Sequence, residues 1–212
     1  MPVIKLVNEM NSVPYDSPDA LYNLLHYVMD PTKDAMEKYR GCTDTLECAG
    51  CEPFPFPLEL QTDPDTVFQY MMVNHSIYRD DIPDLARHRI ISFHPASLIL
   101  PGDLNVLGQM VVRIYRERGY IAAYALHRDT FAYHLHLVIS SVSYVNGNKF
   151  HIFQEYNLLS DVIRQWEYEH GKKLDDPEIA AKYMDLLFGD SSVSYGKIAL
   201  SAKEQLRLNG KR

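Results

Sequence analysis

The alternation of side-chain types in residues 133–143 constrains the fold of this chain more than any other feature. Successive side chains of a β-strand point to opposite faces of the sheet, so His134 and His136 share one face, roughly 7 Å apart along the backbone. Leu135 and Leu137 share the other face, which has the apolar character of a surface buried against helices. The segment therefore predicts a strand with two imidazoles on the open side of a sheet.

The remaining periodic segments predict an α+β fold, with a central, mostly antiparallel sheet and helices packed on one face. A hairpin should join residues 120–126 to 133–143 across the loop at 128–132, and Asn146-Gly147 should turn the chain. We expect the other strands at 3–7, 89–93 and 149–153, and helices at 16–30, 103–118 and 158–170. Residues 40–66, with all three cysteines and the run Pro53-Phe-Pro-Phe-Pro57, are expected to form a long irregular stretch.

The length and composition of the chain limit the classes of protein to which it can belong. At 212 residues the chain fits one domain with a small appendage, and we divide it into residues 1–170 and a C-terminal helical extension with a basic tail, 171–212. No apolar run reaches the ~20 residues of a membrane span, the first residues do not have the pattern of a secretion signal, and an odd number of cysteines argues against a disulfide framework. We therefore expect a cytoplasmic protein with no membrane partner.

The charge is unevenly distributed. The net charge of −7 argues mildly against binding to nucleic acid. Residues 1–84 carry 15 acidic and 5 basic side chains, however, whereas residues 85–212 carry 13 acidic and 16 basic ones. The half that contains the histidine strand is therefore the basic half, and local charge decides contacts with phosphates.

A third histidine makes a metal site plausible. His127 lies just after the strand that should pair with residues 133–143, and with the His134/His136 pair it could hold a divalent cation with open coordination positions. Neutral imidazoles favour Mn, Zn, Co or Ni over Mg by affinity, and availability in the cell could reverse that order. Asp129 could hydrogen-bond a ligating imidazole and fix its tautomer. The alternative is two surface histidines and one core histidine without a metal.

Two further side chains have both a structural and a functional interpretation. Ser92 lies on an apolar strand, where its hydroxyl could satisfy a backbone group or hydrogen-bond a phosphate. His88 and His94 flank it and could make further polar contacts, although we favour ordinary surface histidines. Tyr27 lies at the edge of the apolar stripe of the first helix, where its phenol could either pack or reach across to the sheet.

The cysteines raise the question of zinc. Cys48-Ala-Gly-Cys51 is half of a zinc knuckle, and Cys42 with a histidine such as His75 could complete four ligands. Because the chain has no second Cys-x-x-Cys pair, a plain loop with free thiols is the interpretation we favour.

Three blocks of this chain, taken in order, resemble the relaxase, or mobilisation nuclease, family of plasmids and integrative elements. They are Leu24-Leu-His-Tyr27-Val-Met-Asp-Pro31, Ile90-Ile-Ser92-Phe-His-Pro95, and His127-Arg-Asp129-Thr-Phe-Ala-Tyr-His134-Leu-His136. The third block is specific, whereas the first two are weak by themselves. Together the blocks and the surrounding elements cover about residues 3–170.

The resemblance implies a chemistry for these residues. Tyr27 would attack a phosphodiester of single-stranded DNA at a transfer origin, leaving a covalent 5′-phosphotyrosyl intermediate and a free 3′-hydroxyl. His127, His134 and His136 would hold a divalent metal (Mg, Mn or Zn). Asp129 would orient a ligand or help to deprotonate Tyr27, and Ser92 would contact DNA near the cut.

The resemblance also implies partners, and other functions remain open beside it. The partners would be single-stranded DNA at the origin, accessory proteins of mobilisation and a coupling protein. A rolling-circle replication initiator shares the chemistry. A non-catalytic DNA-binding or accessory protein could keep the fold, and a metal phosphoesterase would cut DNA with water and form no adduct.

Overall fold

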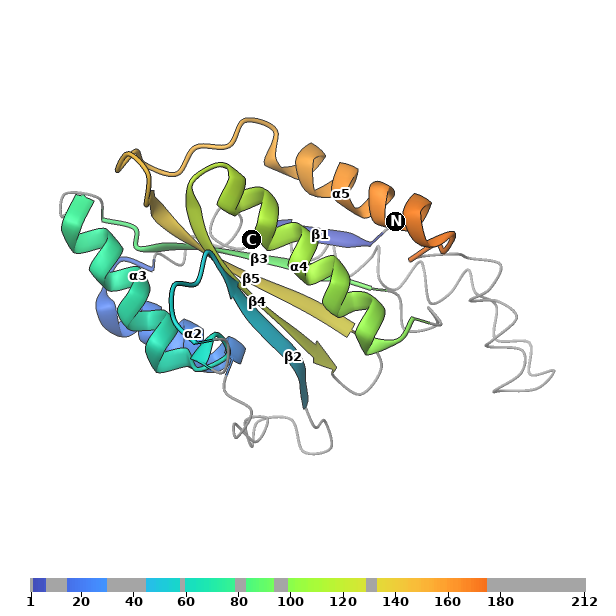
Figure 1. Cartoon of the computed structure of the whole chain (residues 1–212), viewed down its shortest axis with the longest axis horizontal. Helices are drawn as coiled ribbons and strands as arrows, with labels where there is room; N and C mark the ends of the chain where they lie inside the picture. Colours follow the sequence, from blue (N-terminus) through green and yellow to red (C-terminus); the bar gives the residue numbers. More distant parts are fainter. Residues whose placement is uncertain are drawn as a thin grey trace, which may run out of the picture.

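The structure is a computed structural model of the chain, and it describes residues 2–6, 15–29, 45–57, 60–78, 83–93, 99–128 and 133–174. Its helices and strands are shown in Figure 1 and follow one another in the order β1 (Val3–Leu6), α2 (Pro18–Met29), β2 (Thr45–Glu52), α3 (Pro64–Tyr78), β3 (Ala86–Ser92), α4 (Pro101–Glu117), β4 (Tyr120–Arg128), β5 (Tyr133–Ser143) and α5 (Glu155–His170).

The five strands form one antiparallel sheet in the order β1-β3-β5-β4-β2. The histidine strand β5 is therefore the central strand, hydrogen-bonded to β3 on one side and to β4 on the other. The predicted hairpin between β4 and β5 is present, and Gly147 turns the chain after β5 with a φ of 69°, in the left-handed region that glycine adopts readily. The predicted α+β fold with a central antiparallel sheet is confirmed.

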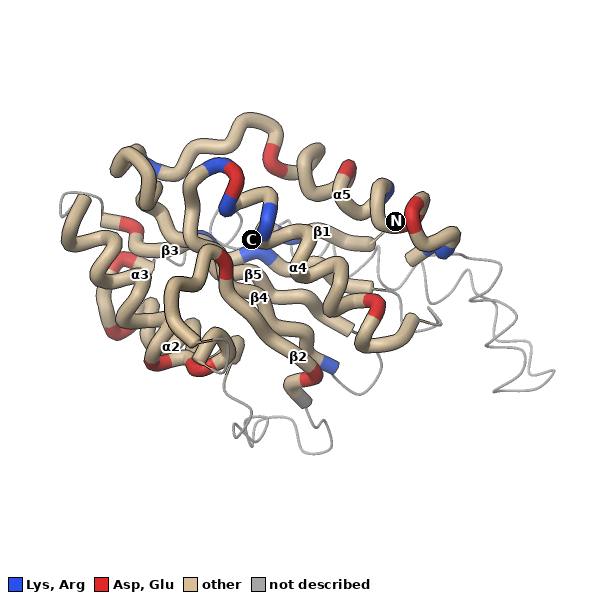
Figure 2. Tube along the Cα trace, in the orientation of Figure 1, with Lys and Arg blue, Asp and Glu red and all other residues tan. Residues whose placement is uncertain are grey.

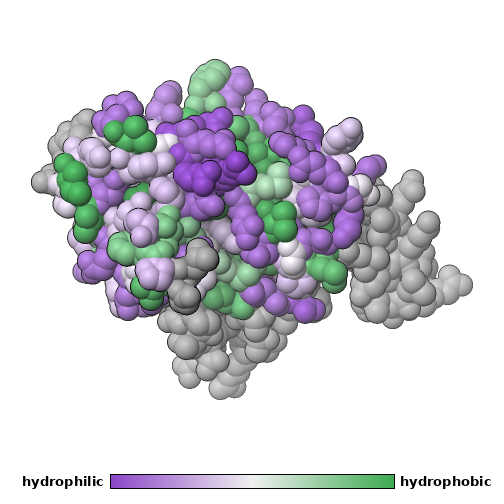
Figure 3. Space-filling view, viewed as in Figure 1, coloured by the Kyte–Doolittle hydropathy of each residue, from purple (hydrophilic) through white to green (hydrophobic). Residues whose placement is uncertain are grey.

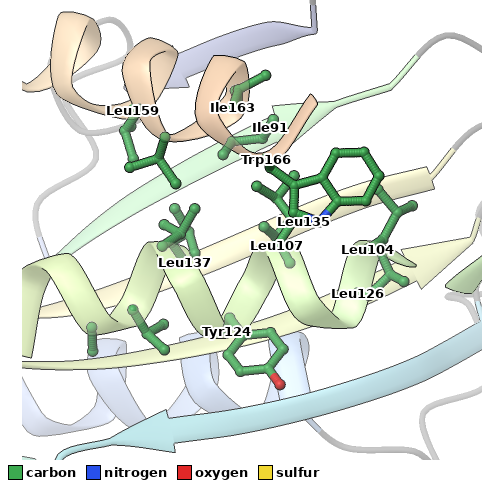
Figure 4. Packing of buried hydrophobic residues seen from close by; sticks show 14 of the residues in the cluster. Ile91, Leu104, Leu107, Tyr124, Leu126, Leu135, Leu137, Leu159, Ile163 and Trp166 are labelled. Carbon is green, nitrogen blue, oxygen red and sulfur yellow. The ribbon is translucent and has the colours of Figure 1, made fainter. Parts of the chain in front are cut away.

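Helices cover both faces of the sheet. On the face that carries Leu135 and Leu137, α4 and α5 pack with Leu107 and Trp166 against the strands (Figure 4). This pair of helices corresponds to the one-sided layer expected from the sequence, and its outer surface is largely hydrophilic (Figure 3). A second pair, α2 and α3, packs on the opposite face, where Val138 belongs to a separate core cluster. The histidine face of the sheet is thus partly covered by helices.

The structure differs from the sequence-based prediction of local structure in three places. The stretch predicted to be irregular contains β2, which pairs with β4 at the edge of the sheet. Helix α3 was not predicted, because its apolar side chains are not confined to one stripe and exposed Val73 and Ile77 interrupt the pattern. The strand expected at 149–153 is wrong, since among the described residues this segment makes only an isolated bridge between Val142 and Lys149. The basic tail lies outside the described residues.

Tyr124 lies between α4 and β2 because two glycines leave room for its ring. A Cβ at Gly108 of α4 would lie 2.5 Å from the Tyr124 Cδ2 atom, and one at Gly50 of β2 would lie 2.7 Å from Cε1. The Tyr124 hydroxyl donates a hydrogen bond of 2.6 Å to Oδ1 of Asn105. The ring is therefore confined from both sides and at its tip.

We predict that Gly108→Ala destabilises the protein, although alanine is the better helix former by about 1 kcal/mol. The added methyl group must displace the confined Tyr124 ring, and such overpacking costs about 1–3 kcal/mol. Gly102→Ala in the same helix is the matched control, because a Cβ there meets nothing within 4 Å. Urea unfolding should show a lower midpoint for Gly108→Ala only, and equal midpoints for the two variants would contradict this packing.

A buried ion pair joins β3 to α5. The Arg89 guanidinium donates hydrogen bonds to both carboxylate oxygens of Glu155, from Nε over 3.0 Å and from Nη2 over 2.8 Å. Arg89 is fully buried, Glu155 is 6% exposed, and the Tyr115 hydroxyl donates a third hydrogen bond of 2.7 Å to the same carboxylate. Burial and the Glu155 charge raise the pKa of Tyr115 well above its usual value, so this phenol stays protonated as a donor.

None of the helices in the described ranges combines the length and the apolar character needed to cross a bilayer.

Candidate active site

The register of the sheet brings the predicted polar residues to one place. His134 of β5 lies opposite His127 of β4 and opposite Ser92 of β3, and His136 lies two positions further along β5. Directly paired residues point to the same side of a sheet, so all four side chains share the face that α2 and α3 partly cover. The His127 and His136 rings are 4.7 Å apart between centroids.

Helix α2 places Tyr27 over this histidine face. Its buried stripe, which includes Leu24, Leu25 and Val28, packs against the sheet and leaves Tyr27 at the edge, 41% exposed. The Tyr27 ring centroid lies 5.7 Å from that of His136 and 6.2 Å from that of His127. The sequence therefore placed Tyr27 correctly at the edge of the stripe, and the structure brings it beside two of the predicted histidines.

A fourth histidine belongs to the same cluster. His88 of β3 is 4% exposed, its ring lies end to end with that of His136 with centroids 5.3 Å apart, and its Nε2 lies 3.0 Å from Nδ1 of His136. The expectation that His88 is a surface histidine is wrong. Its neighbours in sequence are two arginines, and only the pairing of β3 with β5, a non-local contact, shows that it is buried.

Tyr15, which precedes α2, extends the cluster. Its hydroxyl lies 3.2 Å from Nδ1 of His88. Burial, and then the proximity of Tyr27, raise the pKa of Tyr15. No motif in the sequence indicates this contact, because Tyr15 and His88 are 73 residues apart.

The buried imidazoles are held in the neutral form. Burial is the largest cause of the lowered pKa of His136, and the neighbouring His127, His88 and His134 add to it. Burial also lowers the pKa of His88 to about 4, with further contributions from Arg89 and His127. At neutral pH both rings can therefore act as hydrogen-bond acceptors or as metal ligands, which only the neutral imidazole can do.

The donor types suit a divalent cation, although the side chains are not gathered around one point. Nδ1 of His134 contacts the Ser92 hydroxyl at 3.1 Å and Nδ1 of His136 contacts His88, so Nε2 is the nitrogen that each ring would use as a ligand. Nε2 of His127 contacts the carbonyl oxygen of Val28 at 2.5 Å, and this ring would have to give up that contact to ligate through the same atom. Within the described part of the chain, no three His, Cys, Asp or Glu side chains form a group that could hold a metal.

Three of the residues considered from the sequence keep roles that stay predictions. Ser92 is half-buried, its hydroxyl lies 3.1 Å from Nδ1 of His134, and its contact with DNA stays a prediction. Asp129 and His94 lie outside the described residues, so their expected roles stay predictions as well.

The cysteines of β2 do not converge on a zinc ion. Cys48 pairs with Leu126 and packs against the α4/α5 cluster, whereas Cys51 pairs with Ala123 and belongs to the α2/α3 cluster on the other face. Neither Cys48 nor Cys51 forms a disulfide within the described residues, and burial raises the pKa of Cys48 to about 11. They lie in a strand rather than in a loop, and Cys42 lies outside the described residues.

The fold and the site together define an α+β domain whose central strand presents histidines on one face of an antiparallel sheet. Residues 57–172, more than half of the chain, match the relaxase family model described as MobA/VirD2-like, nuclease domain, and the chain belongs to this family. Searches among curated proteins and among solved structures find no match. The matched region contains His88, Ser92 and the three predicted ligands, whereas Tyr27 precedes it. Membership assigns the chain to the nucleases that nick DNA in mobilisation, in general terms.

Proposed function

We propose that this chain is a metal-dependent, site- and strand-specific DNA strand transferase that nicks one strand at a transfer origin through a covalent 5′-phosphotyrosyl intermediate. The observation that carries the proposal is the position of Tyr27, a partly exposed phenol beside His127 and His136, within a family of DNA-nicking domains. We place the nuclease in residues 1–170 and an extension in residues 171–212, and we expect the protein to act in the cytoplasm.

Tyr27 is the proposed nucleophile. Its oxygen forms a bond to phosphorus while the bond from phosphorus to the 3′ oxygen of the preceding nucleotide breaks, and that oxygen is released as a hydroxyl. A phenol with a pKa near ~10 needs help to lose its proton at neutral pH, and we assign that role to Asp129. The ester bond to tyrosine keeps the free energy of the phosphodiester, so the strand can be rejoined later without ATP.

His127, His134 and His136 would hold the divalent metal (Mg, Mn or Zn). A cation held by neutral imidazoles keeps its full positive charge, and it would offset the negative charge that gathers on the phosphate oxygens in the transition state. The lowered pKa of His136 supports this role, because the ring does not have to lose a proton before it binds. The Ser92 hydroxyl, beside His134, is the proposed contact to DNA near the cut.

The distribution of charge suggests the direction from which DNA approaches. Asp19 and Asp65 are the only charged residues of α2 and α3, apart from histidines, and these helices are acidic in Figure 2. On the sheet, Lys5 of β1 is exposed on the histidine face, and the exposed Arg128 ends β4, with its guanidinium over the Tyr133 ring on the other face. We therefore propose that the single strand crosses the exposed ends of the strands rather than the two helices.

The proposal is tested by incubating the purified chain with single-stranded oligonucleotides from candidate transfer origins and Mn²⁺. We expect a covalent protein–DNA adduct that survives denaturing electrophoresis, together with a product that ends in a free 3′-hydroxyl. Cleavage without an adduct would identify a phosphoesterase that uses water. Binding without cleavage would identify a non-catalytic DNA-binding protein. An adduct formed on a replication origin, rather than on a transfer origin, would favour a rolling-circle initiator.

We predict that the double variant His134→Ala/His136→Ala loses Mn²⁺ binding, measured by titration calorimetry. Each imidazole supplies one of three proposed protein ligands, and one remaining histidine cannot hold the ion. His151→Ala is the control, because His151 is exposed and lies outside the sheet. Unchanged affinity in the double variant would mean that the metal binds elsewhere.

A further inference from the structure

Three side chains from separate parts of the fold form one hydrogen-bonded chain that ends at a proposed metal ligand. The Tyr15 hydroxyl is 3.2 Å from Nδ1 of His88, and Nε2 of His88 is 3.0 Å from Nδ1 of His136. Both histidines are buried, at 4% and 5% exposure, so water cannot easily replace the contact between them, whereas the Tyr15 contact is partly buried. The function proposed above uses His136 but gives no role to His88 or to Tyr15.

The donor and acceptor roles of Tyr15, His88 and His136 depend on one another. A neutral imidazole carries one N–H, so one of its nitrogens donates and the other accepts. In the first arrangement, Nδ1–H of His136 donates to Nε2 of His88, and Nδ1–H of His88 donates to the Tyr15 oxygen. In the second, the Tyr15 O–H donates to His88, Nε2–H of His88 donates to Nδ1 of His136, and Nε2 of His136 carries a proton. Only the first arrangement leaves a lone pair on Nε2 of His136.

We propose that His88 and Tyr15 are positioning residues that hold His136 as the Nδ1–H tautomer, with its Nε2 lone pair directed into the site. The proposal rests on the proposed function to the extent that this lone pair serves a cation there. Ligating histidines usually donate their second nitrogen to a carboxylate or a carbonyl group. Here the acceptor is the His88 imidazole, which is itself in contact with the Tyr15 phenol. An imidazole accepts the hydrogen bond without adding a buried negative charge.

The rings of His88 and His136 lie end to end and nearly in one plane, as an N–H···N hydrogen bond requires. Their planes are 18° apart, so the hydrogen bond and the packing of the two rings together limit rotation of His136. His88→Phe keeps a ring of similar shape and removes both nitrogens, whereas His88→Gln restores an acceptor without the ring. The pair of variants therefore separates the hydrogen bond from the packing.

The test uses the full chain with ¹⁵N-labelled histidine, free of metal, because long-range ¹H–¹⁵N spectra distinguish the two tautomers of an imidazole. We expect His136 to be the Nδ1–H tautomer in the wild type and to shift towards the Nε2–H tautomer in His88→Phe. Tyr15→Phe should give a smaller shift in the same direction. Tyr22→Phe is the control, since the Tyr22 ring packs on His26 at a tilt. An unchanged His136 tautomer in His88→Phe would overturn the proposal, and if that variant does not fold, Tyr15→Phe decides in its place.

Titration calorimetry with Mn²⁺ supplies a second readout. Loss of an outer-shell partner typically weakens metal binding by about 10–100-fold, so we expect a loss of that size in His88→Phe and recovery of most of it in His88→Gln. Wild-type affinity in His88→Phe would overturn the proposal even if the wild type nicks DNA. If instead the wild type binds no Mn²⁺ and forms no adduct, the proposed function fails, and the tautomer spectra still decide the role of His88.

Discussion

Tyr27→Phe is expected to abolish the covalent protein–DNA adduct, with a loss of more than about 10³-fold in the rate of adduct formation. The substitution removes only the oxygen that would bond to phosphorus, and it keeps the ring that lies beside His127 and His136. Neighbouring groups cannot compensate, because catalysis by positioning and charge has no effect when the nucleophile is missing. The measurement is the radiolabelled adduct formed with an origin oligonucleotide and Mn²⁺.

Tyr22→Phe is the matched control for this experiment. Tyr22 lies in the same helix, and its 39% exposure is close to the 41% of Tyr27, but its ring packs on His26 and Phe68. It should form the adduct at the wild-type rate. An adduct that persists in Tyr27→Phe would assign the nucleophile to another residue, and Tyr15 would be the first to test because it contacts the same histidine cluster.

Glu155→Ala is expected to destabilise the fold by about 3–5 kcal/mol, because it leaves the fully buried charge of Arg89 without its partner. The Tyr115 hydroxyl loses its acceptor at the same time. For a chain of this size the loss corresponds to a fall of roughly 6–20 °C in the midpoint of thermal unfolding. Calorimetry or circular dichroism would measure it.

Glu117→Ala is the control for the buried pair. Glu117 pairs with Arg113 one turn away on α4, but both side chains are more than half exposed. Such a surface pair contributes only about 0.3–0.5 kcal/mol, so its loss should hardly change the midpoint. Similar effects in the two variants would show that Arg89 does not depend on Glu155.

Local patterns predicted the parts of this fold that are built from contacts close in sequence. The alternation along β5 and the short loop before it were enough to predict the β4–β5 hairpin and to place His134 and His136 on one face, with His127 nearby. The stripe of α2 predicted that Tyr27 lies at its edge. In each case the periodicity of one element, or one tight connection, determines where the side chain lies.

The rest of the site depends on pairings between distant segments. Whether His88 is buried is decided by the pairing of β3 with β5, and the sequence around it, Arg87-His-Arg89, has the character of a surface. Strand β2 is rich in small and polar residues and is held by its pairing with β4 rather than by its own propensity. Long-range pairing of this kind leaves no periodic signal in a single sequence.

Strand β3 presents the histidine cluster and the buried ion pair on its two opposite faces. His88 and Ser92 point towards the proposed site, while Arg89, between them, is held by Glu155 at the start of α5. A substitution in α5 can therefore lower nicking activity by letting β3 shift, even though α5 packs on the face of the sheet that does not carry the histidines. Inactive variants in this helix should be assayed for stability before α5 is assigned a contact with DNA.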